Sequence, residues 1–235
     1  MNNKNNRNIP ESNDQGESSE GVTVPPITVT RPKWDTMHEN YPGTNIKTFD
    51  LYKDIGGKTL SPYDTPEKLY DSPYINSCAI RMSRGLNLSG IKLPSSDANH
   101  RDKGGTNGVL KGKDGNNYWF RVKPLGAYIK FLFGNPDKKI LLKTAKVGET
   151  KQKMSDKDWA DIKSKKGIIM FQVSGWGDAT GHFTLWDGAH LVYPGDSQHD
   201  DYDNELYYFH MKYEREANGK RVIIQTNEIL LWELK

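Results

Sequence analysis

The chain contains one cysteine, Cys78, which has the most distinctive chemistry of any residue in the sequence. A single cysteine forms neither an internal disulfide nor a cysteine-based zinc site, so it is either a small buried residue or a reactive thiol. Asn76 and Ser77 are helix-capping residue types, and the residues after them have helical spacing. We therefore expect a helix that begins at the cysteine. Its backbone N–H groups and dipole would stabilise a thiolate; an inert core cysteine is the alternative.

A histidine follows far downstream at the start of an expected strand. Residues 167–173 form an apolar run typical of a buried strand, residues 174–181 are rich in glycine, and His182 opens a second strand, expected to be central, over residues 182–186. Asp187-Gly188 is a hairpin turn signal, so residues 189–193 are expected to return as a third strand. With this turn, His182 lies opposite Tyr193. Asp196 comes just beyond, where its carboxylate could orient the imidazole.

Cys78, His182 and Asp196 are thus the three residue types that nucleophilic acyl transfer needs. The histidine takes the thiol proton and later gives one to the leaving amine, and the acid fixes the histidine tautomer. Asp187 is the main alternative for the acid, although turn chemistry explains it better, and Asp200, Asp201 and Asp203 in the following polar loop are further alternatives. The remaining histidines lack a comparable context and are expected at the surface or in the core: His38, His100, His190, His199 and His210.

Two segments carry a resemblance to a known family, namely residues 78–87 (CAIRMSRGLN) and residues 181–188 (GHFTLWDG). Together they resemble the type VI secretion amidase effectors of the fourth family, which are antibacterial, papain-like cysteine amidases related to the NlpC/P60 group. The resemblance implies an α+β fold in which the helix bearing Cys78 packs on an antiparallel sheet. It implies Cys78 as nucleophile, His182 as base and Asp196 as the third residue. Family members carry cysteines around that third residue, and this chain has none there.

The resemblance also implies a function and partners. The reaction would be hydrolysis of the D-glutamyl–meso-diaminopimelate bond of peptidoglycan stem peptides, without a metal or cofactor. An immunity protein and the type VI secretion machinery would be partners. Arg81 is expected to meet substrate carboxylates, with a structural ion pair as the alternative. Trp176 and Gly177 are expected to line the cleft, with packing as the alternative for the tryptophan. A housekeeping cell-wall cysteine hydrolase and a non-catalytic wall-binding module are the other candidate functions.

Composition limits the other classes of function. The 235 residues carry a net charge of +3, which is too balanced for the basic face of a nucleic-acid-binding protein. No stretch is apolar enough for a transmembrane helix. The first fifteen residues lack the apolar core of a signal peptide, so we expect synthesis in the cytoplasm and export, if any, by a machine that does not read such a signal. The family resemblance implies delivery to the periplasm of target bacteria. Residues 1–28 are polar and are expected to be a disordered leader, and residues 29–235 to form one domain.

Overall fold

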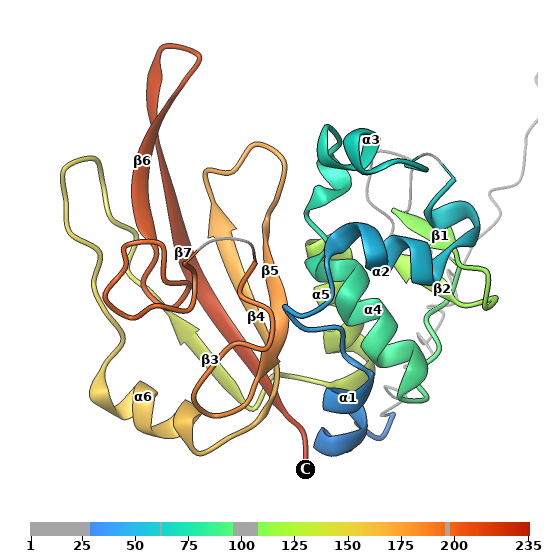
Figure 1. The fold of residues 1–235 in the computed structure, drawn as a ribbon. Coiled ribbons are helices and arrows are strands. Elements are labelled where there is room, and N and C mark those ends of the chain that lie inside the picture. Colours follow the sequence, from blue (N-terminus) through green and yellow to red (C-terminus); the bar gives the residue numbers. More distant parts are fainter. Residues whose placement is uncertain (1–28, 62, 96–107, 196–197) are drawn as a thin grey trace, which may run out of the picture.

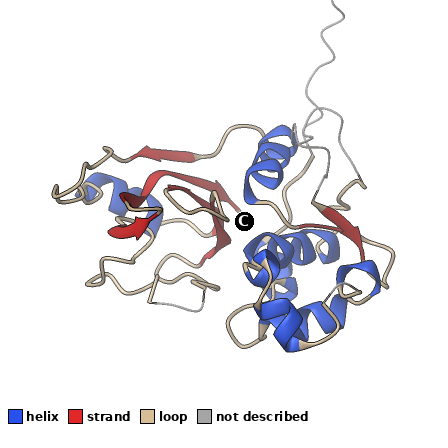
Figure 2. Cartoon of the chain, turned by 90° about the horizontal axis from the view of Figure 1, so that it is seen from above, coloured by secondary structure: helices blue, strands red, loops and turns tan. Residues whose placement is uncertain are grey.

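The computed structural model describes residues 29–61, 63–95, 108–195 and 198–235. The predicted leader, residues 1–28, lies outside this part of the chain. Helices come mostly from the first half of the chain and the main sheet comes from the second half, and the two lie side by side (Figure 1). Seen from above, they form separate helical and sheet layers that meet along one face (Figure 2). The predicted α+β class, with the Cys78 helix packed on an antiparallel sheet, is confirmed.

The helices and strands have the following bounds. The helices are α1 (Trp34–Asn40), α2 (Thr48–Ile55), α3 (Pro66–Tyr70), α4 (Cys78–Leu88), α5 (Val122–Phe133) and α6 (Asp156–Lys163), with short 3₁₀ turns at Gly57–Thr59 and Pro73–Ile75. The strands are β1 (Val109–Lys111), β2 (Asn117–Trp119), β3 (Lys138–Leu141), β4 (Gly167–Ser174), β5 (Gly181–Trp186), β6 (Lys212–Ala217) and β7 (Lys220–Glu233).

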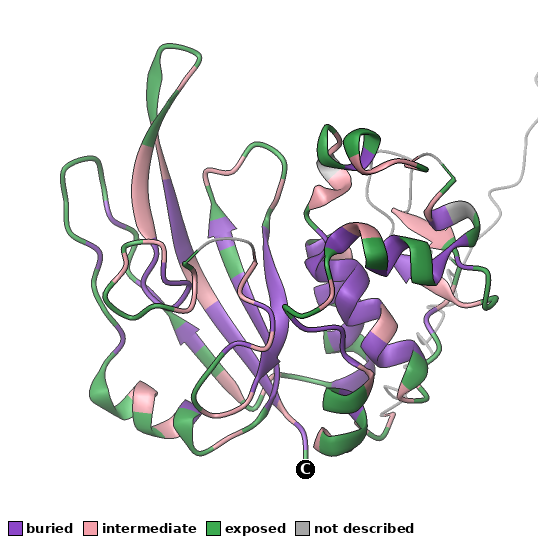
Figure 3. Cartoon of the chain, in the orientation of Figure 1, coloured by how far each residue is buried: buried purple, intermediate pink, exposed green. Residues whose placement is uncertain are grey.

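The helix α4 is the central element of the helical layer. Nine of its eleven residues are buried, including polar ones, so it is covered on most sides (Figure 3). It contacts α1, β2 and β5, while α5 packs beside it and also reaches β5. A helix enclosed in this way has a fixed position, because moving it would expose apolar surface on several faces at once. The first residue of α4, Cys78, is therefore held rigidly against the sheet.

The main sheet is antiparallel throughout, in the order β3–β7–β4–β5, with β6 pairing with the free half of β7. The predicted strands at 167–173 and 182–186 are confirmed as β4 and β5. The prediction that the histidine strand is central was wrong, because β5 lies at the end of the described strand order. An end strand leaves its outer side open to side-chain contacts from the loop that follows it.

The predicted third strand at residues 189–193 was also wrong. This segment makes only one isolated bridge to β5, between Trp186 and Leu191. Asp187 Oδ1 accepts the N–H groups of Ala189 (2.7 Å) and His190 (2.6 Å), which bends the chain instead of extending a hairpin. The chain does turn here, but one residue later than predicted, because the Asp187 N–H donates to the His190 carbonyl (3.2 Å) across Gly188 and Ala189. The Val192 N–H still donates to the Leu185 carbonyl (2.9 Å), whereas the Tyr193 N–H goes to the Thr184 side chain instead of continuing a ladder.

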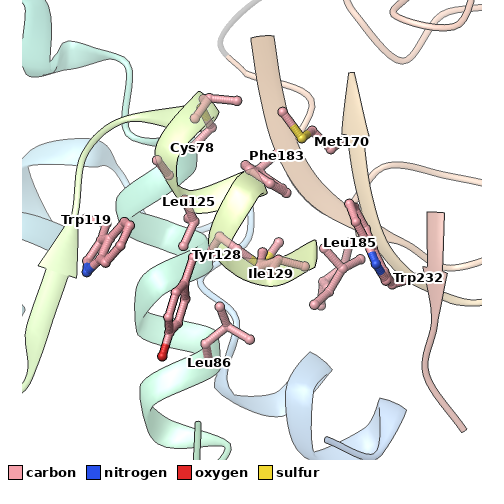
Figure 4. Packing of buried hydrophobic residues seen from close by; sticks show 14 of the residues in the cluster. Cys78, Leu86, Trp119, Leu125, Tyr128, Ile129, Met170, Phe183, Leu185 and Trp232 are labelled. Atoms are coloured by element: carbon pink, nitrogen blue, oxygen red, sulfur yellow. The ribbon is translucent and has the colours of Figure 1, made fainter. Parts of the chain in front are cut away.

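The sheet buries a core on each face. On β4, Met170 belongs to the cluster shared with the helices, whereas Phe171 belongs to the cluster on the opposite face. On β5, Phe183 and Leu185 face the helical cluster, in which Cys78 also lies (Figure 4). This alternation follows from the two-residue period of a strand. Accordingly, Trp186, the next residue of β5, belongs to the cluster on the opposite face.

Candidate functional site

The helix that carries the cysteine begins at the predicted residue, but it is not capped as predicted. Ser77 occupies the N-cap position and makes no capping hydrogen bond to the helix. Its hydroxyl instead lies 3.1 Å from Thr48 Oγ1, 3.3 Å from the Tyr193 hydroxyl and 2.9 Å from Arg81 Nε, which donates to it. Asn76 Nδ2 donates to Asp178 Oδ2 at 3.0 Å. Both polar residues thus connect the start of the helix to other segments.

Cys78 is buried, with 6% of its surface exposed. Burial raises the pKa of its thiol; hydrogen bonds from the Phe183 and Ala79 backbones, together with the charge of Arg81, act in the opposite direction. Without substrate, Cys78 is therefore a neutral thiol near pH 7, and not the thiolate that the sequence suggested. The helix start does lower the pKa, as the sequence predicted, but desolvation outweighs it.

His182 is buried on β5, with 4% of its surface exposed. Burial lowers its pKa to about 3, so the imidazole is neutral near pH 7. Its Nε2 lies 2.7 Å from the carbonyl oxygen of Tyr193. A carbonyl only accepts, so Nε2 carries the proton and Nδ1 is left with a free lone pair. The ring stacks on Tyr208 at a centroid distance of 4.5 Å, which fixes its plane.

Tyr193 is held against β5 by two side chains of one strand face. Its N–H donates to Thr184 Oγ1 at 2.8 Å, and its carbonyl oxygen meets His182 Nε2. Residues 182 and 184 lie on the same face because a strand alternates with a period of two. The sequence placed Tyr193 opposite His182, but the Trp186–Leu191 bridge brings Tyr193 opposite Thr184, and it reaches His182 through its backbone carbonyl.

Cys78 and His182 line the same cavity, which has a volume of about 280 Å³. Trp176 also lines this cavity, and its indole Nε1 donates to the Tyr213 hydroxyl at 2.9 Å. Gly177 is exposed and is not part of the described lining. Asp178 is the one Asp, Glu, Lys or Arg side chain among the lining residues that the structure describes.

The structure gives Arg81 a different environment from the one the sequence suggested. Its side chain is 1% exposed and does not line the cavity of Cys78. Its guanidinium donates to the backbone carbonyls of Pro42, Gly43 and Ile46 at 2.7 to 3.0 Å. A substrate carboxylate would have to displace these bonds. The interpretation of Arg81 as a substrate contact is therefore corrected to a buried structural position, and its partners are carbonyls instead of the anticipated ion pair.

The candidate acids occupy different places. Asp196 lies outside the described residues. Asp187 accepts two backbone N–H groups in the turn after β5, as its turn assignment predicted. Asp200 lies 3.2 Å from His190 Nδ1 and accepts the N–H of Leu191, so its described contacts do not include His182. Among the described residues, the group that orients His182 is the carbonyl of Tyr193.

His199 is a site residue that the sequence did not indicate, since it was expected in the core or at the surface. It lines the cavity, stacks on Tyr208 at 4.4 Å and has its Nδ1 2.6 Å from the carbonyl oxygen of Leu206. Its position in a polar loop, with neither strand nor helix periodicity, carried no signal. Tyr208 therefore stacks on two histidines of the cavity, His182 and His199.

The described residues contain neither a cluster of metal-ligand side chains nor a helix that could span a membrane. No group of three or more His, Cys, Asp or Glu side chains in residues 29–61, 63–95, 108–195 and 198–235 could hold a metal ion. Within the same ranges, no helix has the length and apolar character needed to span a bilayer.

The fold and cavity define an α+β protein in which a thiol at a helix start and a neutral imidazole on an antiparallel sheet share one pocket. The family model of the type VI secretion system amidase effector protein 4, Tae4, matches residues 74–232. The chain belongs to this family of amidase effectors, so the predicted family is confirmed.

Solved structures agree with this assignment. Tae4 from Enterobacter cloacae is 26% identical, with a TM-score of 0.58 over 88% of this chain and 99% of that chain. The Tae4–Tai4 effector–immunity complex from Enterobacter cloacae gives 25% identity and a TM-score of 0.59 over 88% and 100%. The complex from Salmonella Typhimurium, at 22% identity and a TM-score of 0.58 over 88% and 100%, supports the fold alone. A search of curated proteins gave no match.

Proposed function

We propose that this effector is a cysteine amidase that hydrolyses the D-glutamyl–meso-diaminopimelate bond of peptidoglycan stem peptides. The amidase activity follows from the family; the mechanism and the bond are the proposal. The observation that supports the mechanism is the shared cavity of Cys78 and His182, in which the Nε2 proton of His182 is committed to Tyr193. The remaining ring nitrogen, Nδ1, is then the basic one.

The reaction would start from a neutral pair. As Cys78 Sγ attacks the amide carbon, its proton passes to His182 Nδ1, and the resulting imidazolium protonates the leaving amine so that the C–N bond breaks. Water then attacks the thioester, His182 takes a proton from it, and the thiol is regenerated. A histidine with a pKa of about 3 is a weak base, so the reaction does not pass through a resting thiolate–imidazolium pair, and the proton moves to His182 only as Cys78 Sγ attacks.

The start of α4 supplies the groups to stabilise the oxyanion. The first N–H groups of a helix have no intrahelical partner, and those of Cys78 and Ala79 lie close enough to the thiol to affect its pKa. Such donors stabilise the negative oxygen of the tetrahedral intermediate. We keep Asp196 as the proposed acid, acting on the imidazolium charge, while the Tyr193 carbonyl fixes the tautomer.

The proposal includes the partners and the place of action. The related effectors were solved in complex with the immunity protein Tai4, and a wall-cutting enzyme requires such a protein in the cell that makes it. We propose that a cognate immunity protein binds this chain, and that type VI secretion delivers the enzyme to the periplasm of target cells, where peptidoglycan is its substrate.

Muropeptide analysis tests the proposal. Purified peptidoglycan that contains meso-diaminopimelate is incubated with the enzyme, with Cys78→Ala and with the control His190→Gln, whose ring is largely exposed. Mass spectrometry should show new D-glutamate and diaminopimelate ends with the wild type and the control only. Cys78→Ala should keep the circular dichroism spectrum of the wild type. Release of the same peptides by Cys78→Ala would disprove the covalent mechanism, and cleavage at another bond would disprove the assigned specificity.

A further inference from the structure

Arg81 is a cation buried in the helical layer beside the site. Its four polar contacts within 3.0 Å are neutral: the hydroxyl of Ser77 and the carbonyls of Pro42, Gly43 and Ile46. Among the described residues no carboxylate forms an ion pair with it. Burying a charge without an opposite charge is costly, and an apolar side chain commonly fills such a space at less cost. The position therefore requires an explanation beyond packing.

The guanidinium also lies over the ring of Tyr193. Its Cζ is 3.9 Å from the ring centroid, and the Tyr193 hydroxyl lies 3.3 Å from the Ser77 hydroxyl that Arg81 Nε binds. Such a cation–π contact is strongest where water is excluded, as it is for this pair. Arg81 thus contacts the ring face of Tyr193 directly and its hydroxyl through Ser77.

That tyrosine is the residue whose backbone orients the base. The carbonyl of Tyr193 meets His182 Nε2 at 2.7 Å, and its N–H meets Thr184 at 2.8 Å. The segment after β5 forms no continuous ladder: Leu191 makes an isolated bridge to Trp186, and the Val192 N–H donates to the Leu185 carbonyl. The contacts of Tyr193 itself, including those of its ring, therefore contribute to holding the carbonyl in place. A shift of the ring would move the carbonyl away from the imidazole.

Arg81 stands on the same helix as the nucleophile, one turn after Cys78. Contacts therefore run from α4 through the guanidinium to Tyr193, and from its carbonyl to His182. We infer that Arg81 is a positioning residue that fixes the Nε2-protonated tautomer of His182 by clamping Tyr193 to the nucleophile helix. This inference rests on the proposed function for its effect on turnover. The arginine charge also lowers the pKa of the Cys78 thiol, which favours the thiolate formed on attack.

The test compares Arg81→Lys with Arg84→Lys. Lysine keeps the charge but loses the planar group that stacks on a ring and binds several acceptors. Arg84 lies on the same helix and pairs with Asp54 at the surface, away from the cavity, so it is the matched control. For each folded variant, kcat and KM are measured on purified peptidoglycan fragments. The tautomer of His182 is read from ¹⁵N NMR shifts without substrate.

We expect Arg81→Lys to lower kcat by about 10- to 100-fold, because misplacement of a reacting group has an effect of this size. KM should stay within about twofold, as for the loss of an interaction that acts in the transition state. The His182 signal should change from one tautomer to a mixture. Arg84→Lys should match the wild type in all three measurements.

Three results would overturn the inference. The first two are a wild-type kcat in folded Arg81→Lys and a fall in kcat with the His182 tautomer unchanged. The third is a rise in KM alone, which would indicate that Arg81 binds substrate. If Arg81→Lys does not fold, Tyr193→Leu provides the test, since it removes the ring and keeps the carbonyl. It should give the same loss of tautomer, and an unchanged tautomer would refute the clamp. Because the tautomer is read without substrate, activity in Cys78→Ala would refute the proposed function and leave this inference standing.

Discussion

Acidification is expected to destabilise the folded protein through His182, because the fold buries this imidazole in its neutral form. The unfolded chain takes up a proton on His182 below its ordinary pKa of 6.5, whereas the folded chain does so only near a pKa of about 3. The unfolded state therefore binds more protons between these values, and stability falls as the pH falls. Between about pH 7.5 and about pH 5, this one group should remove about 2 kcal/mol from the free energy of unfolding.

Urea unfolding at several pH values within this range measures the effect. The wild type is compared with His182→Gln, in which an amide replaces the imidazole and can still donate to the carbonyl of Tyr193. Other groups titrate in the same window, so the informative quantity is the difference in pH dependence between the two proteins. His190→Gln, at an exposed ring, serves as the control. Equal pH slopes in the wild type and in His182→Gln would show that the imidazole is not buried in its neutral form, and the assignment of its resting state would fail.

Two further predictions concern residues around β5. Asp196→Asn is expected to lower kcat on the order of a hundredfold, because the carboxylate that stabilises the protonated His182 is lost. Asp187→Asn should keep a kcat near that of the wild type, because Asn-Gly suits the same turn. Kinetics on peptidoglycan fragments compares them, and the reverse order would move the acid to the turn. Gly181→Ala should destabilise the fold by about 3 kcal/mol or more in thermal unfolding, since its Cβ would stand 2.2 Å from the Phe171 carbonyl oxygen. An unchanged melting temperature would contradict this close approach.

The elements with strong local patterns could be predicted from the sequence. The helix at Cys78, the strands at 167–173 and 182–186, and the turn at Asp187 all have signals within a few adjacent residues. The two segments around Cys78 and His182 also identified the family, which the family match to residues 74–232 confirms. Their assignment as nucleophile and base stays a proposal, to be tested by Cys78→Ala.

Other features could not be read from the sequence, because they depend on which distant groups share one buried space. Burial decides that the thiol and imidazole are neutral, although the local helix start favours a thiolate. The irregular path of residues 189–193 decides that a carbonyl orients the histidine, since the Tyr193 N–H bonds to the Thr184 side chain and its carbonyl to His182 instead of continuing a regular ladder.

For Arg81, the sequence predicts its position on the helix, but only the fold decides what its side chain contacts. Its place on the helix, one turn after the cysteine, follows from the sequence alone. Whether it faces solvent or the core depends on the segment at residues 42–46, which supplies three carbonyls to it, and on Tyr193, which supplies its ring. Periodicity records the direction of a side chain relative to its own helix, whereas desolvation and long-range hydrogen bonding depend on the neighbours that only the folded chain brings together.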